Sequence, residues 1–143
     1  MDKKRLTSPC GADCFNCLSY EGNITEDFKK RVAAFLSIPV EETPCKGCRD
    51  ESGKCKLAKG NCATWNCAQE RGVEFCYECA DFPCAYYTPS LKGADLLHNL
   101  KVYNLCRIKV IGIDRWIEEV AEIRERYYNG RFIVGAGPVL END

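Results

Sequence analysis

Residues 67–84 read CAQERGVEFCYECADFPC, and they hold four of the twelve cysteines in a chain of 143 residues. At the centre is a Cys-x2-Cys pair, Cys76 and Cys79, followed by Cys84. Such a pair presents two sulfurs from one tight turn, which is half of a tetrahedral site with Zn–S distances of about 2.3 Å. The cysteine-rich loops contain too few apolar residues to fold by burial alone. The stretch therefore predicts loops that are shaped by bound metal.

The same spacing recurs toward the N-terminus, at Cys14/Cys17 and at Cys45/Cys48. In the second of these pairs Gly47 permits a turn that directs backbone N–H groups at the sulfurs. Eleven cysteines are candidate metal ligands: Cys10, Cys14, Cys17, Cys45, Cys48, Cys55, Cys62, Cys67, Cys76, Cys79 and Cys84. They would fill two four-thiolate sites with some to spare, or nearly fill three. Spacing does not indicate which cysteines share an ion.

Disulfides are the other way to use so many cysteines, and the cellular compartment decides between the two. Residues 1–9, MDKKRLTSP, lack the apolar stretch of a secretory signal. No apolar run approaches the roughly 20 residues that a membrane span requires. We therefore expect a cytoplasmic protein without a membrane segment, in which the thiols stay reduced and bind metal.

Thiolate ligands suit both zinc and iron–sulfur clusters. The Cys10-x3-Cys14-x2-Cys17 spacing is the one that radical S-adenosylmethionine enzymes use for their cluster, but those enzymes need a partial barrel that this chain is too short to form. The ferredoxin pattern also fails, because Pro83 precedes Cys84 instead of following it. We expect two or three zinc ions, with an iron–sulfur cluster as the alternative.

The charge is balanced, with 20 basic and 21 acidic side chains. This balance provides no global basic field of the kind that marks a nucleic-acid-binding domain, so no nucleic-acid partner is expected. Five cations cluster around the central cysteines: Lys46, Arg49, Lys54, Lys56 and Lys59. They would offset thiolate charge, belong to a solvated loop or, as the least favoured of the three interpretations, contact nucleic acid. His98 is the only histidine, which excludes Cys2His2 fingers and favours closed all-sulfur sites over catalytic ones.

The fold class predicted is mainly α with irregular metal-binding loops: a small, Cys-rich, zinc-stabilised domain. One domain is expected over 1–143, with a metal-binding part at about 10–84 and a helical part at about 91–128. In the first part Thr25 is a good N-cap for a helix that ends before Pro39. That helix would bury Phe28, Val32, Phe35 and Leu36. A second helix is expected over 62–71, with Gly72 as its left-handed terminator.

Two helices are expected in the second part. The first would bury a stripe made of Leu96, Leu100, Tyr103, Cys106 and Val110, widened by Leu97 and Ile108, in which Cys106 is a buried inert thiol. After Gly112, Asp114 would cap the second helix, which buries Trp116, Val120, Ile123 and Tyr127. Its charged residues, Glu118, Glu119, Glu122, Arg124 and Glu125, would face water. Residues 131–134 could form a short strand.

Several of these segments carry a family resemblance: Cys10-Gly11-Ala12-Asp13-Cys14-Phe15-Asn16-Cys17, Cys45-Lys46-Gly47-Cys48, the whole of 67–84, 104–109, and 116–119. On them the chain resembles the prokaryotic DUF3795 family, whose members are of unknown function and presumed to bind zinc. The likeness runs from about Cys10 to Glu119 and implies metal binding and the fold class, but no reaction. Family members commonly have a Cys-x2-Cys pair ahead of the position of Cys67, whereas here six residues separate Cys55 from Cys62.

Three functional classes follow. The main hypothesis is a zinc-binding protein without enzymatic activity, a structural scaffold for binding or interaction with an unknown protein partner. The alternative is an iron–sulfur protein for redox chemistry or electron transfer. The third is a thiol enzyme that uses an unligated cysteine, for which Cys55 is the best candidate.

Overall fold

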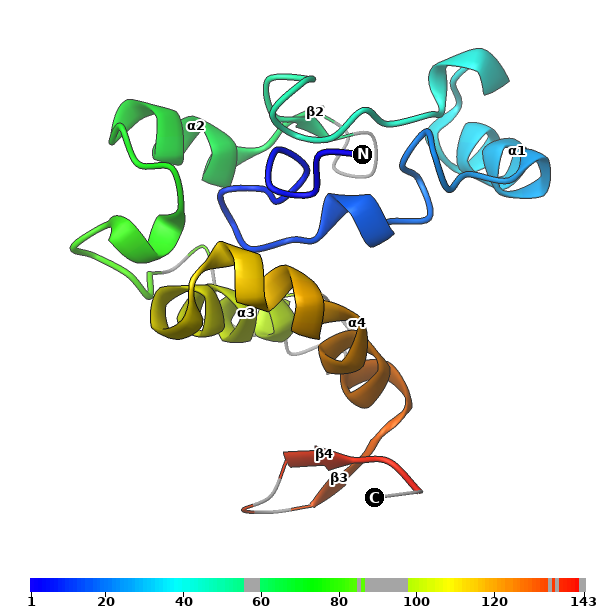
Figure 1. Cartoon of the computed structure of the whole chain (residues 1–143). Coiled ribbons are helices and arrows are strands. Elements are labelled where there is room, and N and C mark those ends of the chain that lie inside the picture. Colours follow the sequence, from blue (N-terminus) through cyan, green and yellow to red (C-terminus); the bar gives the residue numbers. More distant parts are fainter. Residues whose placement is uncertain (56–59, 85, 87–97, 134, 136, 142–143) are drawn as a thin grey trace.

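The computed structural model describes residues 1–55, 60–84, 86, 98–133, 135 and 137–141. Its elements in chain order are η1 (Cys14–Asn16), α1 (Glu26–Leu36), η2 (Val40–Glu42), β1 (Lys54–Cys55), β2 (Gly60–Asn61), α2 (Ala63–Glu70), η4 (Cys76–Glu78), α3 (His98–Ile111), α4 (Ile113–Asn129), β3 (Arg131–Ile133) and β4 (Gly137–Val139). The cysteine-rich part forms one layer, and α3 with α4 forms a second layer beneath it (Figure 1). Helices dominate the described residues, which confirms the mainly α prediction. No described helix is long and apolar enough to cross a bilayer.

Both helices of the cysteine-rich part form where the sequence predicts them. Thr25 caps α1, because its hydroxyl oxygen accepts a hydrogen bond from the N–H of Phe28 at 3.2 Å. The buried face is rotated from the expected one, since Val32 and Ala33 are buried while Phe35 is 69% exposed. Helix α2 ends at Glu70, and Gly72 follows with a positive φ of 63°.

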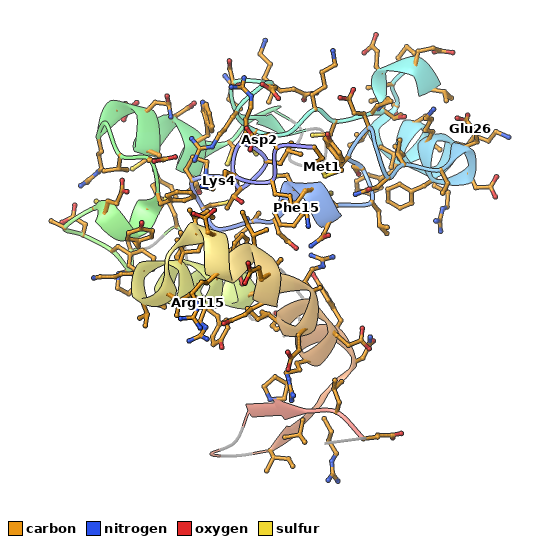
Figure 2. All side chains as sticks on the ribbon, viewed as in Figure 1. Met1, Asp2, Lys4, Phe15, Glu26 and Arg115 are labelled. Atoms are coloured by element: carbon orange, nitrogen blue, oxygen red, sulfur yellow. The ribbon has the colours of Figure 1, made fainter. Side chains whose placement is uncertain are left out.

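Two hydrophobic clusters join the two layers, and the first contains the large aromatic side chains Phe15 and Trp116. Leu6 and Phe15 from the cysteine-rich part pack with Ile108 of α3 and with Trp116 and Val120 of α4. The rings of Phe15 and Trp116 meet edge to face, with centroids 6.2 Å apart. In Figure 2 Phe15 lies on the side of its layer that meets the helices. The cysteine-rich loops therefore bury apolar side chains against α3 and α4, although they were expected to lack the means to fold by burial.

The stripe expected on α3 is only partly right. Leu100 and Ile108 are buried, but Tyr103 is 54% and Val110 77% exposed, and Cys106 is exposed as well. Leu96 and Leu97 lie outside the described residues. Apolar residues occur around much of the helix, so the pattern alone could not select the buried face. The packed face runs through Leu105 and the polar residue Asn104 instead.

Asn104 is buried because it satisfies polar groups of both layers. Its amide nitrogen donates to the Gly11 carbonyl oxygen at 2.9 Å, and its amide oxygen accepts from the Trp116 indole N–H at 3.3 Å. Gly11 approaches α3 so closely that an added Cβ would lie 2.8 Å from Leu105 Cγ and from the Lys101 carbonyl oxygen. This contact fixes the first cysteine segment against the helical layer.

The remaining expectations concern element ends. Helix α4 buries Trp116 and Val120 as predicted, but it begins at Ile113 with Gly112 as its N-cap, so Asp114 is not the cap. Residues 131–133 form the expected strand and pair with β4 in an antiparallel hairpin that the sequence analysis missed. The short antiparallel pairing of β1 with β2, inside the loop between Cys45 and Cys62, was not predicted either.

Candidate metal centre

Four of the predicted ligands line one pocket of about 310 Å³: Cys67, Cys76, Cys79 and Cys84. The pocket lies between α2 and the loop that follows it, and Arg71, Asp81 and Phe82 also line it. These are the four cysteines of the 67–84 stretch, so a single local segment supplies a complete set of four sulfurs.

Local hydrogen bonds shape this segment. After α2 the chain reverses at Gly72 and enters the 3-10 turn η4, where the Cys79 N–H donates to the Cys76 carbonyl oxygen at 3.1 Å. The Glu78 carboxylate accepts from the N–H groups of Glu74 at 2.8 Å and Phe75 at 3.2 Å, which holds the entry to the turn. The Cys76 N–H donates to the Pro9 carbonyl oxygen at 2.9 Å and ties the turn to the first cysteine segment.

Arg71 places positive charge beside the sulfurs of this pocket. Its Nη1 lies 3.1 Å from Cys79 Sγ and 2.6 Å from Asp81 Oδ2, and its side chain also hydrogen-bonds that of Cys67. The hydrogen bond to Asp81, together with the charges of Cys79 and Asp81, raises the pKa of Arg71 above its ordinary value. A guanidinium in this position stabilises ionised sulfur, which is the form that binds metal.

A second pair of cysteines meets in the N-terminal layer. The Cys14 and Cys48 side chains are hydrogen-bonded to each other, and this bond is the main reason that the pKa of Cys14 falls to about 7. The Ser8 hydroxyl also bonds Cys14, and it lies 3.1 Å from Cys10 Sγ. Two segments more than thirty positions apart therefore bring their sulfurs into contact.

The backbone of Cys45, the other cysteine of the second motif, is bonded to residues that closely follow Cys17. Residues 19–21 flank Cys45: its N–H donates to the Ser19 carbonyl oxygen at 2.8 Å, and its carbonyl oxygen accepts from Glu21 N–H at 2.8 Å. Gly47 has a φ of 96°, and its N–H donates to Cys45 Sγ at 3.4 Å. The expected turn with an N–H directed at sulfur is therefore present.

A buried ion pair beside Cys14 was missed. Asp13 is 3% exposed, and Arg124 Nη1 of α4 lies 3.0 Å from its Oδ1. Burial raises the pKa of Asp13, and hydrogen bonds from Asn16 and Arg124 offset part of this effect. Arg124 was expected to face water, because nothing in its own helix marks an acid on a distant loop as its partner.

Of the other predicted ligands, Cys10 lies beside both groups: the Ser8 hydroxyl that bonds Cys14 is 3.1 Å from Cys10 Sγ, and Cys76 and Cys84 pack against the Cys10 cluster. Cys10 is buried in a cluster with Phe75 and Leu105, and Cys62 precedes α2 as its N-cap. Cys55 is in β1, and its side chain is outside the described residues. Within the described part of the chain, no three or more Cys, His, Asp or Glu side chains are arranged so that they could hold a metal ion. The donors that line the pocket nevertheless have the chemistry that zinc selects, since they are sulfur and lie beside a cation.

Comparison with known proteins gives one match. Residues 6–89 match the sequence model of a family described as "Protein of unknown function (DUF3795)". The match covers more than half of the chain and ends before α3, so the expected likeness at 104–119 is not part of it. No curated protein and no solved structure matches. The chain belongs to the DUF3795 family, whose function is unknown.

Proposed function

We propose that this chain is a zinc-binding protein in which Cys67, Cys76, Cys79 and Cys84 hold a structural zinc ion. The resulting rigid module serves as a scaffold for binding a protein partner. The observation that carries the proposal is that these four cysteines line one pocket together with an arginine. The twelve cysteines of the chain and its membership of a Cys-rich family are consistent with it.

Zinc binding would require the sulfurs to move inward. A tetrahedral ion with Zn–S distances of about 2.3 Å needs sulfurs about 3.8 Å apart. The pocket of about 310 Å³ is wider than such a site, so the four side chains would rotate toward its centre and narrow it. Three of them lie in loops or at ends of the short turn η4, where the backbone is not held in a long helix.

The charges of the pocket favour bound thiolates. Four thiolates around one zinc ion carry a formal charge of about −2. The Arg71 guanidinium, already 3.1 Å from Cys79 Sγ, would offset part of this charge and donate to the sulfurs. Neutral thiols would need no such partner.

Four sulfur ligands leave no open position, so the proposed zinc is structural and not hydrolytic. Its effect would be to link α2, η4 and the chain at Cys84 through one ion. Structural zinc contributes an apparent ~10–16 kcal/mol in small peptides at neutral pH, which is comparable to the stability of a whole domain. The scaffold role follows from this rigidity and from the absence of a coordination site for substrate.

The test is metal analysis of the full chain purified anaerobically without added metal. The proposal predicts bound zinc and no visible absorption band, and it predicts that Cys79→Ser lowers the zinc content by about one ion. Cys106→Ser is the matched control, because this exposed cysteine on α3 lies outside the pocket and should leave the content unchanged. Bound iron and a brown protein solution would refute the zinc proposal and support the iron–sulfur alternative. Absence of metal, or equal zinc in both variants, would overturn it.

A further inference from the structure

We infer a second, separate zinc site formed by Cys14, Cys17, Cys45 and Cys48, so that the chain divides eight of its cysteines into two four-thiolate centres. This inference rests on the proposed function in one respect, that thiolates of this chain bind zinc. It adds which cysteines share an ion, which neither the spacing nor the family description provides.

The first step is the contact between the two Cys-x2-Cys motifs. Cys14 begins η1 and Cys48 ends the Cys45–Cys48 turn, and their side chains are hydrogen-bonded. Two thiols at hydrogen-bonding distance are close to the separation that two ligands of one zinc ion require. One sulfur from each motif is therefore already beside the other, and among the described residues the side chains of Cys17 and Cys45 would have to rotate to join them.

The second step is the backbone of each motif. In the 45–48 turn the Gly47 N–H donates to Cys45 Sγ, and an N–H directed at sulfur stabilises the thiolate. Gly47 has a φ of 96°, and an added Cβ would lie 2.9 Å from Leu6 Cδ2, so this position requires glycine for two reasons. In η1 the Cys17 N–H donates to the Cys14 carbonyl oxygen at 3.0 Å, which closes a tight turn between these two cysteines. Both motifs therefore have the turn that a pair of ligands needs.

The third step is the backbone that connects Cys17 to Cys45. Tyr20 forms a parallel bridge with Cys45, and the Tyr20 N–H donates to the Cys17 carbonyl oxygen at 3.1 Å. Ser19 stands between Cys17 and Tyr20 in the chain, and its carbonyl oxygen accepts from the Cys45 N–H. It is 2% exposed, and its hydroxyl has no hydrogen-bond partner among the described residues. A buried hydroxyl without a partner is costly, and an ionised sulfur of a neighbouring cysteine would supply the acceptor.

This centre is distinct from the pocket of Cys67, Cys76, Cys79 and Cys84. Its ligands come from η1 and the 45–48 turn, whereas the pocket lies between α2 and the chain around η4. Arg49 bridges the two regions: its side chain donates to the carbonyl oxygens of Thr7 at 3.0 Å and Glu74 at 3.2 Å. Cys10 lies beside both centres, and it is left out of both sets because four sulfurs already complete each one.

The test counts zinc ions by native mass spectrometry of the full chain. We expect two ions in the natural chain, one in Cys45→Ser, one in Cys79→Ser, and none in the double variant. Cys17→Ser is a second variant of the new site, which serves if Cys45→Ser does not fold, and it should also hold one ion. Cys106→Ser is the control and should keep two, because Cys106 is exposed on α3 and belongs to neither set.

The outcomes separate the two proposals. One ion in the natural chain that Cys79→Ser loses and Cys45→Ser keeps would refute the second site and leave the proposed function intact. One ion that Cys45→Ser loses and Cys79→Ser keeps would support the second site and refute the pocket. Two ions in both Cys45→Ser and Cys17→Ser would overturn the grouping, and a metal-free natural chain would overturn both proposals.

Discussion

Replacing Arg71 by methionine removes the cation beside the proposed zinc ligands without removing a ligand. In the native arrangement Arg71 Nη1 lies 3.1 Å from Cys79 Sγ and 2.6 Å from Asp81 Oδ2. The variant would leave Asp81, a second negative charge, near the thiolates without its partner. Zinc should therefore bind more weakly.

The size of the loss follows from the exposure of the arginine. Groups that hydrogen-bond metal ligands typically change metal affinity by about 10–100-fold when they are mutated. The Arg71 side chain is 46% exposed, so water and salt screen its charge. We therefore expect the lower end of that range, about tenfold. Arg71→Lys should fall between the natural chain and Arg71→Met, since it keeps the charge but loses the planar fork.

The assay is competition for zinc with a chromogenic chelator, at low and at high salt. Arg126→Met is the matched control, because Arg126 forms an ion pair with Glu122 at 2.9 Å on the surface of α4, away from the pocket. The two variants should differ about tenfold at low salt, and the difference should shrink at high salt. Equal zinc affinity of Arg71→Met and Arg126→Met would refute the argument that Arg71 supports the thiolates.

Three further predictions concern stability and pH. Gly11→Ala should lower the free energy of unfolding by about 2–5 kcal/mol, because Gly11 has a positive φ and an added Cβ would clash with α3. Gly72→Ala is the control: an added Cβ meets nothing there, so only the backbone cost of about 1–2 kcal/mol remains. Equal losses for the two variants in denaturant titrations would contradict the close approach of Gly11 to α3. Arg124→Met should cost about 3 kcal/mol, the lower end for a buried ion pair, because it leaves the buried Asp13 without its cation while the Arg124 side chain is itself 25% exposed. Arg107→Met is the control, because the more exposed ion pair of Arg107 with Glu119 should contribute at most about 1 kcal/mol. A similar loss of stability in both variants would contradict the claim that burial makes the Asp13–Arg124 pair costly to break. Lowering the pH should release zinc, because thiolates that take up protons lose the metal. Zinc release is followed with a chromogenic chelator during an acid titration, and zinc that stays bound in acid would count against sulfur ligation.

Local signals in the sequence identified the helices of the cysteine-rich part. Thr25 predicted the start of α1, because a capping hydroxyl bonds an N–H within the first turn. Gly72 predicted the end of α2, because glycine readily adopts the positive φ that terminates a helix. The face of α3 could not be predicted in this way. Its buried stripe includes Asn104, a polar residue whose partners, Gly11 and Trp116, are distant in sequence.

Motif spacing identified the candidate ligands but not their grouping. The four cysteines of the pocket come from one stretch of 18 residues, so their proximity could be anticipated from that stretch. The contact of Cys14 with Cys48 depends on how residues 19–21 pair with Cys45, which no spacing encodes. The Asp13–Arg124 ion pair was missed for the same reason, since it joins residues 111 positions apart.

X-ray absorption at the zinc edge of the unsubstituted chain tests the central claim most directly. We predict a first shell of four sulfur atoms at about 2.3 Å, with no nitrogen or oxygen ligand. A shell that contains nitrogen or oxygen, or a protein that holds iron in place of zinc, would contradict the account.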